Sequence, residues 1–230
     1  MMVLDKNDPN YRQCSLSVMD NIADPDITFD ENGICDACRF TEQKKSTINW
    51  SDRDKQLREL CDKHRKNDGS YDCLVPGSGG KDSAYQAHVL KYKYGMNPLT
   101  VTWPPILYTD YGLKNWKNWL DSGFDNISFY RNGKVMKLLN KLSIENLLHP
   151  FQPFIVGQRI IGPAMAKKFG VKLVMYGENQ AEYGNKVDAN KILTMNTNFF
   201  TVDDPLEMNL GGVKMKEIID RNEPTFREVW

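Results

Sequence analysis

The chain has 230 residues, and its 30 Lys and Arg residues balance 30 Asp and Glu residues, so the formal net charge is zero. Hydrophobic residues make up 40% of the chain and charged residues 26%. These values are typical of a globular protein and exclude a disordered chain, a collagen-like chain and a membrane bundle.

Two absences in the sequence point to where the protein acts. Residues 1–14 carry four charged side chains and lack the apolar stretch of a secretory signal, and no apolar run approaches the roughly 20 residues that a membrane helix needs. The five cysteines are an odd and sparse set, which is typical of a reducing compartment. We therefore expect a cytoplasmic protein that does not bind a membrane. We also expect no nucleic-acid partner, because the charge is balanced.

Residues 1–66 are predicted to form a small N-terminal domain. Turn-forming residues dominate residues 1–50, which show neither a helical nor a strand period, so we expect loops there. Residues 51–66 are strongly charged and carry a narrow apolar stripe at helical spacing, which predicts a helix with Ser51 as its N-cap. The turn sequence Asn67-Asp68-Gly69 then ends this helix.

Residues 67–230 alternate predicted strands with predicted helices and form the second domain. The strands are expected at 71–76, 99–103, 126–130 and 172–176, and the helices at 84–94, 113–122, 135–148, 155–169 and 214–220. This alternation is typical of βαβ units and predicts an α/β fold with a parallel, doubly wound sheet that helices cover on both faces. We expect Leu113, Trp116 and Leu120 to point inward, and Pro163 to disturb its helix.

A glycine-rich motif, Pro76-Gly77-Ser78-Gly79-Gly80-Lys81-Asp82-Ser83, lies between the first predicted strand and the next helix. Open α/β sheets bind phosphates at this place, where the carboxyl end of a strand faces a helix N-terminus. The glycines let the backbone approach an anion, Lys81 adds a positive charge, and Ser78 and Ser83 add hydroxyl donors. The motif is not a Walker A loop, because Asp82 stands where that loop requires Ser or Thr. The alternative is a plain glycine-rich turn before a surface helix.

The string Ser78-Gly79-Gly80-Lys81-Asp82-Ser83 is similar to the signature of the PP-loop ATP pyrophosphatases. The flanking segments resemble one branch of that group more closely, the N-acetyl sugar amidotransferases of surface-polysaccharide and nonulosonic-acid pathways. These segments are Tyr11–Cys14, Val18–Asp20, Asp24–Ile27, Phe29–Asp30, Asn32–Cys38, Thr102–Trp103, Gly112–Asn115, Gly123–Asp125, Gly177–Asn179 and Glu182–Gly184. The resemblance therefore runs from about residue 11 to about residue 184.

The resemblance implies an adenine nucleotide alpha hydrolase-like fold and a specific reaction. ATP would activate the acetamido oxygen of a nucleotide-linked N-acetyl sugar, with release of pyrophosphate. Ammonia from a separate glutaminase subunit would then displace AMP and leave an acetamidino sugar. Members of this family are longer than the present chain, so the resemblance also implies a missing C-terminal part that would carry more of the sugar site.

Residue roles follow from the motif, the expected topology and the resemblance together. Lys81 would balance the charge that grows on pyrophosphate, and Asp82 is either a Mg²⁺ ligand or a carboxylate favoured by the helix dipole. We expect the chain to return to the same edge of the sheet at Gly177. The alternative is that Gly177 only forms a turn. The expected ATP-binding residues are Ser78, Gly79, Gly80, Lys81, Asp82, Ser83 and Trp103, with Glu178 as a third catalytic residue beside Lys81 and Asp82. The expected substrate-binding residues are Asn179, Glu182 and Tyr183.

Cys14 and the pair Cys35-x-x-Cys38 suggest a zinc site. A structural zinc site usually has four nitrogen or sulfur ligands, and the resemblance implies a fourth cysteine three residues after Cys14. Ser17 occupies that position, so the site is either incomplete or completed by a substitute. The substitutes considered are Asp20, His64 and water. The alternative is a domain held together by packing alone.

Two other functions stay open. A PP-loop ligase for tRNA thiolation or amide formation is disfavoured, because thiolation needs a reactive cysteine and a basic face, whereas Cys61 and Cys73 occupy predicted core positions. A truncated, non-catalytic nucleotide-binding module is favoured by the short chain and by Ser17, and disfavoured by the intact motif at residues 78–83.

Overall fold

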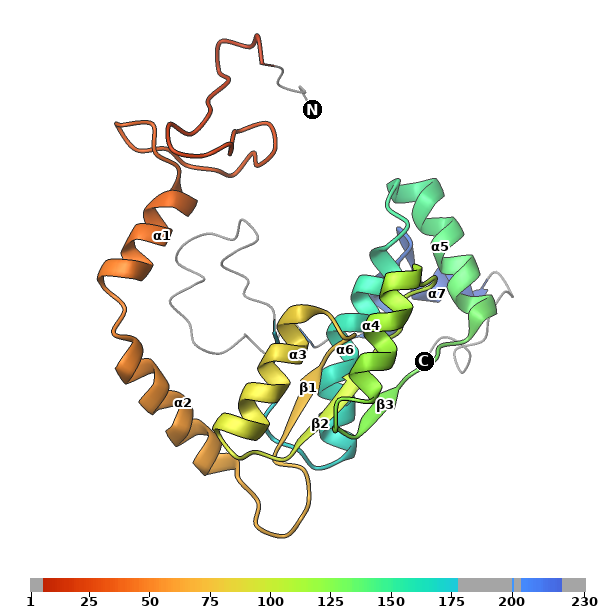
Figure 1. Cartoon of the computed structure of the whole chain (residues 1–230). Helices are drawn as coiled ribbons and strands as arrows, with labels where there is room; N and C mark the ends of the chain where they lie inside the picture. The colour runs from red at the N-terminus through yellow and green to blue at the C-terminus, as the bar shows by residue number, and fades with distance from the viewer. Residues whose placement is uncertain (1–5, 178–199, 201–203, 221–230) are drawn as a thin grey trace. The chain divides into compact units, whose positions relative to one another are not determined.

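The computed structural model describes residues 6–177, 200 and 204–220 (Figure 1). The chain divides into two compact units, and the division falls between Leu57 and Arg58. This point lies inside a helix, α2 (Trp50–His64), whereas composition places the predicted domain boundary after that helix. Among the described residues, no helix is long and apolar enough to cross a membrane.

The first unit is rich in loops and has a very small core. Its buried residues are Cys14, Ile27 and Cys35. Two isolated antiparallel bridges, Gln13 with Asp20 and Phe29 with Cys35, join the loops. The loop-rich character predicted for this part of the chain is therefore present up to Cys35.

A helix that the sequence analysis missed, α1 (Asp36–Ser46), follows these loops. None of its residues is buried, so it lacks the apolar stripe by which an amphipathic helix is recognised. Local interactions at its two ends favour the helix instead. The Cys35 sulfur accepts a hydrogen bond from the Cys38 N–H, and basic residues occupy the last turn. The expectation of loops throughout residues 1–50 is wrong for this segment.

The start of α2 also differs from the prediction. The Asn49 side chain accepts hydrogen bonds from the N–H groups of Ser51 and Asp52, at 3.0 and 3.3 Å. Asn49 is therefore the cap, and Ser51 lies inside the helix. Either side chain is a good N-cap, so sequence preference alone does not decide between them.

The second unit is built on a parallel sheet with the strand order β1-β2-β3 (Figure 1). The strands are β1 (Cys73–Pro76), β2 (Pro98–Thr102) and β3 (Asn126–Ser128). On the other side of β1, Val174 pairs with Leu74 in a single parallel bridge. The predicted parallel α/β arrangement is thus confirmed, although the strand expected at 172–176 is present only as this short pairing.

Both faces of the central strands are buried, as expected for a parallel sheet. On one face, Leu74, Leu99 and Val101 pack against α6 (Gln152–Lys168). The residues that alternate with them on the other face are at most 1% exposed. These residues are Val75, Thr100 and Thr102.

The helices predicted for the second unit are present, with shifted ends. They are α3 (Lys81–His88), which continues as a π-helical turn (Val89–Lys93), α4 (Asp110–Leu120), α5 (Gly133–Leu147), α6 and α7 (Met215–Asp220). α6 continues past Pro163 to its end at Lys168. In α4 the predicted inward face is wrong, because Trp119 is 2% exposed while Leu113 and Leu120 are 37% and 36% exposed.

A short antiparallel hairpin, β4 (Asn209–Leu210) and β5 (Val213–Lys214), precedes α7 and was not expected. Its turn contains Gly211 and Gly212, both with positive φ. A Cβ at Gly211 would lie 2.8 Å from the Leu142 Cβ, so the turn packs closely on α5. The hairpin and α7 share a core with the buried face of α5.

Candidate functional site

The motif at residues 78–83 forms the turn from β1 into α3, at the carboxyl edge of the parallel sheet (Figure 1). This strand–turn–helix context is the one the sequence predicts. Gly79 has a φ of +86°, a conformation that glycine adopts without steric cost. A Cβ at Gly79 would lie 2.5 Å from the carbonyl oxygen of Asn115. The loop therefore rests directly on the backbone of α4.

The backbone of this turn is arranged so that it can meet an anion. Gly80 is the N-cap of α3, and no heavy atom lies within 4 Å of the place its Cβ would occupy. Within the described part of the chain, no acceptor is hydrogen-bonded to the N–H groups of Ser78, Gly79 or Gly80. Because a helix N-terminus carries partial positive charge, this surface can bind a phosphate group.

The charged side chains of the motif lie at the surface. The Lys81 Nζ contacts both carboxylate oxygens of Asp82, at 2.8 and 3.0 Å. Exposed ion pairs of this kind contribute little stability, so a phosphate can compete for the ammonium group at low cost. The Ser83 hydroxyl donates to the Gly80 carbonyl at 3.2 Å, which ties the first turn of α3 to the loop.

The chain returns to this edge of the sheet at Gly177. A Cβ at Gly177 would lie 2.8 Å from the backbone nitrogen of Ser83, and the Gln86 side chain donates to the Tyr176 carbonyl at 2.8 Å. The predicted approach of this segment to the motif is therefore confirmed at Gly177. The predicted site residues that follow, Glu178, Asn179, Glu182 and Tyr183, lie outside the described residues.

Trp103 lies at the same edge, directly after β2. Its indole stacks on Phe129, with ring centroids 5.5 Å apart and planes at 5°. It also packs over Gly157 of α6, where a Cβ would lie 2.1 Å from the ring. The indole forms part of the wall of a cavity of about 500 Å³, and its role in ATP binding stays a prediction.

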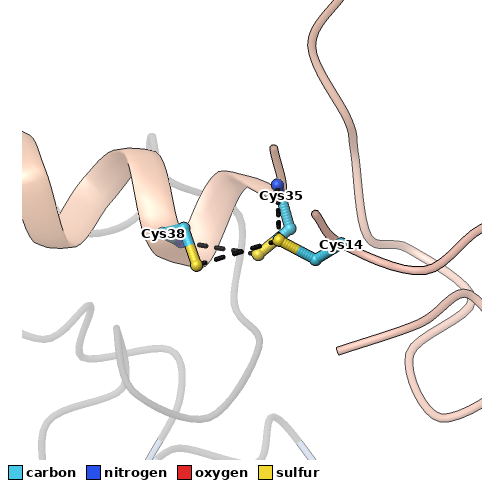
Figure 2. A group of neighbouring side chains, drawn as sticks. All are labelled: Cys14, Cys35 and Cys38. Carbon is cyan, nitrogen blue, oxygen red and sulfur yellow. Dashed lines mark hydrogen bonds between the residues drawn. The ribbon is translucent and has the colours of Figure 1, made fainter. Parts of the chain in front are cut away.

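The three predicted zinc ligands lie together in the first unit (Figure 2). The sulfur atoms of Cys14, Cys35 and Cys38 are all within 4.8 Å of one another, and those of Cys14 and Cys38 are 3.9 Å apart. Around a tetrahedral zinc ion with Zn–S bonds of about 2.3 Å, neighbouring sulfurs are about 3.8 Å apart. The Cys triad can therefore bind a metal ion.

Ser17 faces the same cluster, at the position where the resemblance implies a fourth cysteine. Its Oγ lies 3.8 Å from the Cys35 sulfur and accepts a hydrogen bond from the Met19 N–H at 3.4 Å. An oxygen thus occupies the position implied for a fourth cysteine. Among the described residues of the first unit, the alternative ligand Asp20 does not belong to the group of potential ligands. The other alternative, His64, belongs to the second unit.

Hydrogen bonds at the cluster lower the pKa of the Cys14 thiol to about 6. The Ser17 hydroxyl is the largest cause. The N–H groups of Cys35 and Leu16 also donate to the Cys14 sulfur, at 3.3 and 3.4 Å. Because the thiolate is the form that binds metals, these bonds favour metal binding through Cys14, whereas the pKa of the neighbouring Cys38 is raised.

Comparisons with known proteins show a similarity over part of the chain. No family model matches the chain. Over 89 residues the chain is 32% identical to an uncharacterized protein of Methanocaldococcus jannaschii. This match covers 39% of the present chain and 31% of the relative, so the chain spans less than a third of the relative's length. The match assigns no activity.

Proposed function

We propose that this protein is an ATP pyrophosphatase of the PP-loop type, which binds ATP at residues 78–83 and transfers AMP to an oxygen of its substrate. One observation carries this proposal: the glycine-rich motif joins a parallel strand to an exposed helix N-terminus at the carboxyl edge of the sheet. This is the place where open α/β sheets bind phosphates.

The residues of the motif have separate parts in the proposed reaction. The N–H groups of Ser78, Gly79 and Gly80 would hold the terminal phosphates, and Lys81 would balance charge on the departing pyrophosphate. Mg²⁺ held by Asp82 would neutralise phosphate charge. The substrate oxygen attacks the α-phosphorus, and the bond between that phosphorus and the α–β bridging oxygen breaks.

For the acceptor we propose the acetamido oxygen of a nucleotide-linked N-acetyl sugar. Ammonia from a separate glutaminase subunit would attack the activated carbon and lose a proton, and AMP would leave with the former acetamido oxygen. Support comes from the resemblance over residues 11–184 and from the approach of Gly177 to the motif. The cysteine cluster with Ser17 would hold a structural zinc ion in the first unit.

A thiolation reaction is less well supported by the cysteines. Cys61 and Cys73 are both fully buried, and burial raises the pKa of Cys73 to about 12. Because the thiolate is the nucleophile, neither residue is suited to carry sulfur to a substrate at the motif.

The test is a product assay with the purified chain, ATP, Mg²⁺, ammonium and a panel of nucleotide-linked N-acetyl sugars. We expect AMP and pyrophosphate, together with one sugar in which mass spectrometry detects the exchange of oxygen for NH. Lys81→Ala should abolish AMP formation without changing the melting temperature, whereas Lys141→Ala, at an exposed position on α5, should leave activity unchanged. Normal AMP formation by Lys81→Ala would refute the assignment of the motif.

A further inference from the structure

A cavity of about 500 Å³ lies next to the motif's edge of the sheet, but none of residues 76–83 lines it. Its walls come from the segments after β2 and β3, from α5 and α6, and from the β4–β5 hairpin and its flanks. Small-molecule sites typically have volumes of about 300–1,000 Å³. The cavity is therefore large enough for a ligand of its own.

The wall of this cavity is mainly apolar. Four methionines take part in it, and methionine side chains adapt their shape to a ligand because they are unbranched and flexible. These residues are Met136, Met165, Met208 and Met215. Such a surface gains free energy from burying a ring or an acyl chain, and it offers few partners to the hydroxyl groups of a bare sugar.

Among the described residues of this apolar wall, the cation is Arg131. The Arg131 guanidinium lies 5.1 Å from the Trp103 ring centroid and 5.5 Å from that of Phe154, and it donates to the Pro104 carbonyl. These contacts hold the group in place at the cavity. Partial burial lowers the pKa of Arg131, and the interaction with Tyr108 acts in the opposite direction. Within the described residues, no ion pair joins Arg131 to a carboxylate.

Trp103, which lines the cavity, has a buried polar group of its own. The Trp103 Nε1 is buried and forms no hydrogen bond with the described residues. A half-buried cation without a counter-charge and a buried donor without an acceptor both cost free energy. A ligand that brings an anionic oxygen to the Arg131 guanidinium would reduce the first cost.

We propose that this cavity binds an organic anion whose apolar body lies among the methionines and whose carboxylate, sulfonate or phosphate group pairs with Arg131. The proposal rests on the cavity alone and not on the proposed ATP chemistry, because the motif takes no part in the wall.

The first test uses two fluorescent probes with nearly the same aromatic frame. The probes are 1-anilinonaphthalene-8-sulfonate, which is anionic, and N-phenyl-1-naphthylamine, which is uncharged. We expect saturable binding of both to the full, folded chain. Arg131→Gln should weaken binding of the sulfonate about tenfold or more, because it removes a charge-assisted hydrogen bond, and should change binding of the neutral probe less than about twofold.

Two further variants control the test. Lys137→Gln removes a charge from an exposed position of α5 that does not line the cavity, so it should change neither affinity. Ala164→Trp fills the cavity from α6 and should abolish binding of both probes, which keeps the proposal testable if Arg131→Gln does not fold. Near-ultraviolet circular dichroism checks that each variant is folded. Equal losses for both probes in Arg131→Gln, or unchanged binding in Ala164→Trp, would overturn the proposal.

Competition with unlabelled compounds separates this proposal from the proposed function. Octanoate should displace the sulfonate probe from the wild-type chain and from Lys81→Ala alike. Displacement by AMP but not by octanoate would assign the cavity to the base of the nucleotide and overturn the proposal. Loss of AMP formation in Lys81→Ala with unchanged probe binding would show that the two sites are separate.

Discussion

Replacing Gly79 with alanine tests the geometry of the loop directly. At a φ of +86°, any residue with a Cβ is strained by about 1–2 kcal/mol. The added Cβ would also lie 2.5 Å from the Asn115 carbonyl oxygen and 2.9 Å from its carbon. Overpacking of this kind typically costs about 1–3 kcal/mol. Gly79→Ala should therefore lower the free energy of unfolding by about 2–5 kcal/mol.

Gly80→Ala is the matched control, because Gly80 has neither a positive φ nor a close contact at its Cβ position. Its φ is −65°, and its Cβ would meet no atom within 4 Å. The entropy gained by replacing glycine, about 0.4–1 kcal/mol, roughly offsets the cost of alanine relative to glycine at an N-cap, about 0.5–1 kcal/mol. Gly80→Ala should therefore be close to neutral.

Thermal unfolding followed by circular dichroism measures both effects. For a chain of this size, 1 kcal/mol shifts the melting temperature by about 2–4 °C. Gly79→Ala should thus melt about 4–20 °C below the wild type, and Gly80→Ala within about 2 °C of it. If the two variants melt at the same temperature, Gly79 is not held in a left-handed conformation against α4.

Two further predictions concern cysteine chemistry. Ser17→Cys supplies a fourth thiolate to the cluster, so zinc affinity measured by chelator competition should rise about tenfold or more, while Ser46→Cys at the end of α1 should leave it unchanged. No gain in Ser17→Cys would count against a metal site. The free energy of unfolding should also fall as pH rises above 9.0, because burial raises the pKa of Cys73 from 9.0 to about 12 and only the unfolded chain ionises this thiol. In Cys73→Ala, the free energy of unfolding measured with urea should fall less steeply as pH rises above 9.0. The same pH dependence in the variant and the wild type would contradict this role of Cys73.

The sequence alone determined the elements whose signals are local. The alternation of strands and helices after residue 67, and the place of the motif at residues 78–83 between β1 and α3, followed from side-chain periodicity and turn residues. These patterns depend on neighbours within a few residues along the chain. The proximity of Cys35 and Cys38 is local for the same reason, since they are three residues apart at the start of α1.

The tertiary structure alone decided which distant residues meet. Trp119 rather than Leu113 is buried in α4, because the loop at Gly77 and the ring of Phe124 pack against it. Ser17 reaches Cys35 across a loop, and Arg131 meets Trp103 at a cavity. Apart from the Trp119–Phe124 contact, each of these contacts joins segments far apart in sequence, where neither periodicity nor capping preference carries information. Their positions follow from how the loops and helices pack against one another, which no single segment specifies.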